Sequence, residues 1–68
     1  MSEMIAYRAY LLCTSAYIRE VRGFKAPDDE SACVEADYML SGSDLAAVEV
    51  YQGARMVWRR AKHSQVAA

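Results

Sequence analysis

AVEVYQGARMVWRR, residues 47–60, is the stretch of sequence that decides the fold. Two runs rich in apolar and β-favouring side chains, 47–51 and 54–60, flank Gln52 and Gly53. Glycine allows the positive φ that a tight hairpin turn requires. The segment therefore predicts two antiparallel strands joined by a two-residue loop.

The register of this predicted hairpin decides which residues share a face. A two-residue loop pairs Tyr51 with Ala54 and Val50 with Arg55, and paired residues share a face. A longer loop with a bulge would change the assignment. One face then carries Val48, Val50 and Val57. The other carries Ala47, Glu49, Tyr51, Met56 and Trp58.

The residues before this hairpin predict another one. Residues 5–12, IAYRAYLL, are dense in aromatic and aliphatic side chains and contain no strand breaker, which indicates a strand. The polar residues 13–16 suit a hairpin connection. Residues 17–25 alternate only in part, so we expect a second strand with a bulge at Gly23.

Between the two hairpins the sequence predicts a helix from about Asp28 to Leu40. Pro27 and the acidic residues after it are typical of a helix start, and Gly42 suits a left-handed C-terminal cap. Val34 lies opposite the expected core stripe, as does Tyr38. The side chains expected to face the sheet are Ala32, Cys33, Ala36, Met39 and Leu40.

These elements define one α+β domain over residues 1–61, with a disordered tail at 62–68. The order is ββαββ: two β-hairpins joined by one helix that packs on one face of a small antiparallel sheet. A chain of 68 residues supports a single core, which rarely yields more than about 3–5 kcal/mol without a disulfide, a metal or a second copy.

Several segments resemble a family of short uncharacterised proteins, about 70 residues long, common in rhizobia and related alphaproteobacteria. The resemblance covers most of the chain and implies the ββαββ arrangement, with no assigned activity and no catalytic residue to carry over. This sequence departs from the family at residues 13–16, where an Asp-Gly turn is usual. The matching segments are Tyr7-Arg8-Ala9-Tyr10, Ala26-x-Asp28-Asp29, Ala36 and Val48-Glu49-Val50-Tyr51-Gln52-Gly53-Ala54-Arg55-x-Val57.

Composition and charge argue against several classes of partner. The net charge of −1 gives no overall positive field for nucleic acid or anionic membranes. The apolar run 4–13 is interrupted by Arg8 and is too short to span a bilayer. Glu3 precedes it where a signal peptide carries basic residues. We expect a cytoplasmic protein with no membrane partner.

No group of residues predicts catalysis or metal binding. Cys13 and Cys33 are too far apart for a CxxC pair and are expected to be free thiols. His63 has no acidic or cysteine residue spaced to join it as a ligand. The acids at 28–30 are interpreted as caps of the helix. We expect no enzyme activity, no metal and no cofactor.

Two surfaces stand out late in the chain. Arg55, Arg59 and Arg60 form a candidate basic patch, which beside Tyr51 and Trp58 could bind single-stranded nucleic acid or a small molecule. We prefer the interpretation that charge on an outer strand protects an open sheet edge.

One helix covers only one face of a four-stranded sheet, which leaves the second face to be covered. Tyr10, Tyr51, Met56 and Trp58 are the candidate interface residues on that second face. We expect a homodimer that acts as a non-enzymatic interaction module. A larger protein is a second candidate partner. An accessory subunit of a larger complex is a further hypothesis.

Overall fold

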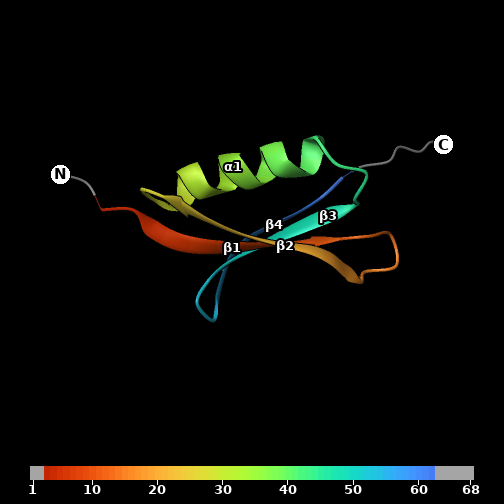
Figure 1. The fold of residues 1–68 in the computed structure, drawn as a ribbon, viewed down its shortest axis with the longest axis horizontal. Coiled ribbons are helices and arrows are strands. Elements are labelled where there is room, and N and C mark those ends of the chain that lie inside the picture. Colours follow the sequence, from red (N-terminus) through yellow and green to blue (C-terminus); the bar gives the residue numbers. More distant parts are fainter. Residues whose placement is uncertain (1–2, 63–68) are drawn as a thin grey trace.

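A computed structural model of the protein describes residues 3–62, which form four strands and one helix. The strands pair antiparallel in the order β2-β1-β3-β4, and the helix lies across one face of the sheet (Figure 1). The predicted ββαββ fold of the α+β class is confirmed. The elements are β1 (Ile5–Leu12), β2 (Ile18–Ala26), α1 (Asp29–Ser41), β3 (Ala47–Gln52) and β4 (Arg55–Ala61).

The helix is the crossover between two strands that are not neighbours. β2 and β3 both run antiparallel to β1, so they are parallel to each other with β1 between them. A connection between parallel strands has to pass over a face of the sheet. Each hairpin consequently supplies one central strand and one edge strand, and α1 covers the junction of the two hairpins.

The core lies between α1 and one face of the sheet, and it contains few large side chains. Leu11, Val48 and Val50 are the largest side chains that are fully buried. The predicted helix stripe is confirmed for its alanines and Leu40, while Cys33 and Met39 are partly buried. Small side chains let the helix backbone approach the sheet closely. The fully buried alanines are Ala9, Ala32 and Ala36.

The predicted N-terminal cap of α1 is confirmed, whereas the predicted conformation of its C-terminal cap is not. Asp28 is the N-cap, as predicted, and its side chain accepts a hydrogen bond of 2.8 Å from the backbone N–H of Ser31. The prediction of a left-handed cap at Gly42 is wrong, because Gly42 has φ −88°. Gly42 is nevertheless the C-cap residue, and its backbone N–H donates to the carbonyl of Tyr38. The backbone N–H and the hydroxyl of Ser43 add two hydrogen bonds to the carbonyl of Leu40.

The first hairpin turns through residues 13–16, as predicted, with Ala16 in the left-handed region at φ 68°. The predicted bulge at Gly23 is wrong, because Gly23 pairs regularly with Arg8. The irregularity lies at the turn end of the hairpin, where Leu11 pairs with Glu20 and Leu12 with Ile18.

The second hairpin also differs from its predicted register. Gln52 pairs with Arg55, so the loop is Gly53-Ala54, one residue later than expected. Gly53 has the positive φ that the prediction required, at 62°. Further along, Tyr51 pairs with Met56 but Val50 pairs with Trp58.

Val57 is therefore the extra residue of a β-bulge, and this bulge changes the face on which Trp58 lies. Trp58 shares a face with buried Val50 and packs against the core beneath α1. The prediction that Trp58 stands on the face opposite the three valines is wrong.

Past β4, Lys62 remains attached to the domain. Its backbone N–H donates to the carbonyl of Ala46 and its ammonium group to the carbonyl of Ser43, at 2.7 Å. The rest of the predicted tail, 63–68, lies outside the described residues. Within residues 3–62 the single helix is not long and apolar enough to cross a membrane.

Candidate protein interface

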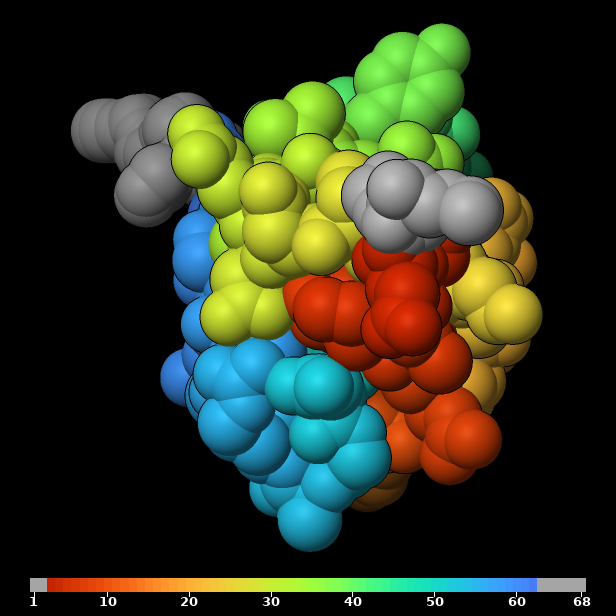
Figure 2. Space-filling model, turned by 90° about the vertical axis from the view of Figure 1, so that its left-hand side faces the viewer, coloured from red at the N-terminus to blue at the C-terminus, as the bar shows by residue number. Residues whose placement is uncertain are grey.

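The side of the sheet that faces away from α1 is the candidate interface, and we call it the open face. Among the described residues no helix or strand lies over it (Figure 1). Figure 2, viewed toward one end of the molecule, shows the yellow-green helix on one side and the cyan tip of the β3–β4 hairpin on the other. The pairing register assigns to the open face Ala6, Arg8, Tyr10, Leu12, Ile18, Val21, Gly23, Lys25, Ala47, Glu49, Tyr51, Met56, Arg59 and Ala61.

Two tyrosines from the central strands form the middle of the open face. The ring centroids of Tyr10 and Tyr51 are 5.4 Å apart and the rings are nearly perpendicular, an arrangement that favours aromatic contact. Together with Ile18, Glu49 and the loop at Gly53 they border a shallow hollow of about 400 Å³.

Aliphatic side chains surround these tyrosines and remain accessible to solvent. Ile18 is 55% exposed, Val21 51% and Met56 44%. Leu12 is buried although it stands on this side of the sheet, outside the main core cluster. The open face thus has a small apolar centre of its own with unburied apolar side chains around it, a composition that marks interfaces.

The structure brings together three of the four predicted interface residues. Tyr10, Tyr51 and Met56 share the open face, whereas Trp58 lies on the other side. The prediction did not include Ile18 and Val21, because the alternation in residues 17–25 is irregular. The aliphatic side chains themselves were the signal that could have identified them.

The predicted basic patch is not assembled on one surface. The Arg55 guanidinium lies 3.3 Å from a carboxylate oxygen of Asp29, and that of Arg60 3.4 Å from Asp37, both on α1. Arg59 belongs to the open face, where its Nε is 3.5 Å from Glu49. Each of the three arginines therefore has a carboxylate neighbour, and two of them lie on the helix side of the sheet.

Glu49 is the only acidic residue among the described residues of the open face, which also carries three basic ones. The side chain of Glu49 is only 22% exposed and lies between Tyr10 and Arg59 in the register. Within residues 3–62, Arg8 and Lys25 form no ion pair. Both stand toward the end of the sheet where β1 begins.

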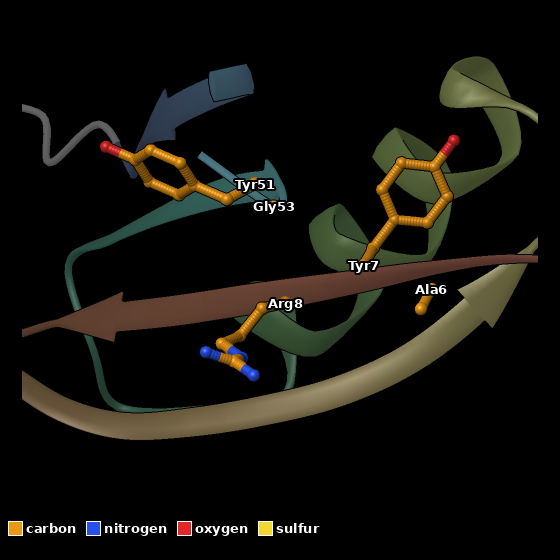
Figure 3. Close-up of a pocket in the computed structure, with 5 residues that line it drawn as sticks. All are labelled: Ala6, Tyr7, Arg8, Tyr51 and Gly53. Atoms are coloured by element: carbon orange, nitrogen blue, oxygen red, sulfur yellow. The ribbon is translucent and has the colours of Figure 1, made fainter. Parts of the chain in front are cut away.

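A second hollow, of about 290 Å³, lies where the pairing of β1 with β3 stops. It is lined by Ala6, Tyr7, Arg8, Tyr51 and Gly53. Figure 3 shows that Tyr7 points up toward the helix, whereas Arg8 points to the opposite side of β1. The lining residues therefore belong to two sides of the sheet, and the hollow is a gap at its end.

On the helix side of that gap a cluster of polar side chains ties α1 to β1 and β4. The Tyr7 hydroxyl donates a hydrogen bond of 2.7 Å to Asp29, which also faces Arg55. Burial and the Asp29 carboxylate raise the pKa of Tyr7 to about 12. The Tyr7 hydrogen bond, and then Arg55, lower the pKa of Asp29 below its ordinary value. This cluster anchors the start of the helix.

The two cysteines are free thiols, as predicted, in different surroundings. Backbone N–H groups of Tyr17 and Ser15 lower the pKa of Cys13. Burial, together with Asp29, raises the pKa of Cys33. Between residues 3 and 62, no three His, Cys, Asp or Glu side chains are grouped to hold a metal ion.

The geometry defines the class of protein as a small ββαββ domain with an uncovered sheet face. Comparisons with protein-family models, with curated proteins and with solved structures return no match. The resemblance to short rhizobial proteins stays a prediction.

Proposed function

We propose that the protein is a small, non-enzymatic interaction module that acts as a homodimer through its open face. The observation that carries the proposal is the apolar centre on the side of the sheet that α1 leaves uncovered. Tyr10 and Tyr51 supply an aromatic pair, and Ile18, Val21 and Met56 are exposed around it. A second copy would bury these side chains and supplement a core with few large residues.

The size of the open face is compatible with a dimer. Four strand widths of about 4.8 Å and the eight residues of β1 at about 3.3 Å each give a face of roughly 19 by 26 Å, or about 500 Å² in projection. Projecting tyrosine, methionine and arginine side chains make its accessible area larger than this projection. The face thus approaches the lower end of the range for stable interfaces, about 600 Å² per partner.

The sheet edges are less suited to association than the face. β2 presents charged residues along its length, and β4 contains the bulge at Val57 and two consecutive arginines. Charges and bulges on edge strands oppose the addition of a further strand. This supports the face over either edge as the surface that meets a second copy.

The ion pairs of the arginines argue against the nucleic-acid alternative. Asp29, Asp37 and Glu49 are each engaged with an arginine, so the predicted basic patch lacks the free charge that a nucleic-acid surface needs. The free thiols of Cys13 and Cys33 fit the reducing cytoplasm, where we place the protein. The proposal involves no cofactor.

Replacing Val21 by lysine tests the proposal. Val21→Lys puts a charge among the apolar side chains of the open face. We expect it to raise the dissociation constant of the dimer by a factor of about 10 or more, because burying an unpaired charge is costly. Sedimentation equilibrium would measure the dissociation constant. Val34→Lys is the matched control, since Val34 is 66% exposed on the outer side of α1.

The two variants show whether the open face or another surface forms the dimer contact. Equal dissociation constants for Val21→Lys and Val34→Lys would exclude the open face as the contact. Circular dichroism of both variants shows whether the fold is retained, so that loss of the dimer is not confused with unfolding.

A further inference from the structure

We infer that the two copies are related by a two-fold axis parallel to the strands, so that the partner's Met56 occupies the hollow over Gly23. This inference rests on the proposed homodimer and specifies how its two open faces fit together. It follows from three features of the open face: the order of residues across the sheet, a gap at Gly23, and the position of the charges.

The open face is organised in rows that cross the four strands. One row contains Gly23, Arg8, Tyr51 and Met56, from β2 to β4. The next contains Val21, Tyr10, Glu49 and Arg59. The last contains Ile18, Leu12, Ala47 and Ala61.

A two-fold axis parallel to the strands, above the β1–β3 boundary, keeps each row in place and exchanges its ends. Because the order is β2-β1-β3-β4, β2 then faces the partner's β4, and β1 faces the partner's β3. Two packed sheets keep their strands within about 30° of each other, which such an axis permits.

Under this symmetry the gap at Gly23 meets a projecting side chain. Gly23 has no side chain and a Cβ built there meets no atom within 4 Å. A shallow hollow of about 300 Å³ lies at this place, lined by two short segments of neighbouring strands, Ala6-Tyr7-Arg8 and Gly23-Phe24-Lys25. Opposite it, at the same row, stands the partner's Met56, a flexible apolar side chain that adapts to irregular gaps. Met56 is 44% exposed in the single chain.

Arg8, Tyr10 and Glu49 have favourable neighbours in this arrangement, while Arg59, whose side chain is 63% exposed on the edge strand β4, lies opposite the partner's Val21. Arg8, which has no ion pair among the described residues, would lie over the ring of the partner's Tyr51, a favourable cation–π position. Tyr10 would face the partner's Glu49, where the phenol hydroxyl can donate to the carboxylate. Lys25 lies one row beyond the end of the β1–β3 pairing, opposite the tip of the partner's β3–β4 hairpin, and its long side chain can extend past that tip into solvent.

The alternative axis, which runs across the strands, is less favourable. When it passes through the middle row it places Glu49 against the partner's Glu49 and Arg59 against the partner's Arg59. Like charges that face each other across the interface oppose association.

The shape of the sheet agrees with the chosen axis. The tip of the β3–β4 hairpin turns to the side of the open face, away from α1 (Figure 1). At the same end of the sheet, across the axis, lie the small residues Ala6 and Gly23. A projecting tip and a shallow area thus occupy corresponding positions on two copies related by this axis.

Gly23→Val tests the fit, because it fills the hollow without disturbing the single chain. A Cβ at Gly23 meets no atom within 4 Å, and β-branched residues favour strands. We therefore expect the dissociation constant of the dimer to rise by about 10- to 100-fold, as overpacking of a contact typically costs. Lys25→Val, on the same strand and face but at the rim, should change it by less than about threefold.

Exchanging the two side chains gives a second test. Gly23→Met combined with Met56→Gly moves the projecting side chain to the other strand, and the two-fold axis brings it over the new gap. The double variant should bind about as tightly as the original protein, whereas each single variant should bind more weakly.

The experiments distinguish failure of the homodimer from failure of the proposed register. If the original protein forms no dimer in sedimentation equilibrium, the proposed function fails. If it dimerises and Gly23→Val leaves the dissociation constant unchanged, the homodimer stands and this register is wrong. The register would also be contradicted if the double variant bound as weakly as Gly23→Met alone, with the same raised dissociation constant.

Discussion

At the scale of single residues, Tyr7 connects the core to the start of the helix. Its ring stacks on Phe24 with centroids 5.7 Å apart, and its hydroxyl donates to Asp29. The raised pKa of Tyr7 means that this contact stabilises the fold below the ordinary tyrosine pKa and is lost as pH rises through about 12. The lowered pKa of Asp29 means that its contribution is present above the unfolded pKa and is lost as pH falls through the folded pKa.

The Tyr7–Asp29 contact predicts an unusual titration. Of the five tyrosines in the chain, Tyr7 should ionise near pH 12, and Asp29→Asn should lower its pKa because the negative charge beside the phenol is removed. The ultraviolet absorbance of tyrosinate, followed against pH, measures this. Asp37→Asn, on the same helix but beside Arg60, serves as the control. An unchanged Tyr7 titration in Asp29→Asn would show that the carboxylate does not raise the pKa of Tyr7.

At the scale of the elements, the first hairpin contains a strained turn. Ala16 adopts φ 68°, in the left-handed region that favours glycine, and its backbone N–H donates to the carbonyl of Cys13 at 2.9 Å. An alanine in this conformation costs about 1 kcal/mol. The β1–β2 ladder and the closing hydrogen bonds hold the residue there.

Ala16→Gly should therefore stabilise the protein by up to about 0.5 kcal/mol, because relief of about 1 kcal/mol of strain exceeds the added backbone entropy of glycine, about 0.5 kcal/mol. Urea denaturation gives the free energy of unfolding. Thr14→Gly is the control, since Thr14 does not have positive φ and its replacement should destabilise the protein. A loss of stability in Ala16→Gly would show that the turn is not strained.

Local patterns were enough to predict the existence and order of the elements. Residues 5–12 form a strand with the predicted bounds, and Asp28 caps the helix. The faces of β4 were not predictable in the same way. The bulge at Val57 carries no glycine or proline to mark it, and a single extra residue moved Trp58 from one side of the sheet to the other.

At the scale of the whole molecule, the fold leaves one sheet face covered and one open. The uncovered face could be predicted from the sequence, because one helix covers only one face of a four-stranded sheet. The sequence could not show that the three arginines fail to form one basic patch. Arg55 and Arg60 approach Asp29 and Asp37 only after α1 has packed on the sheet. Ion pairs between distant segments depend on the completed fold.

The central claim is that the open face binds a second copy, and sedimentation equilibrium over a range of protein concentrations tests it most directly. The account predicts a mass that rises with concentration to twice the 7.6 kDa of the chain. It also predicts that Val21→Lys shifts this transition to higher concentration. A mass of one chain at every concentration would contradict the account.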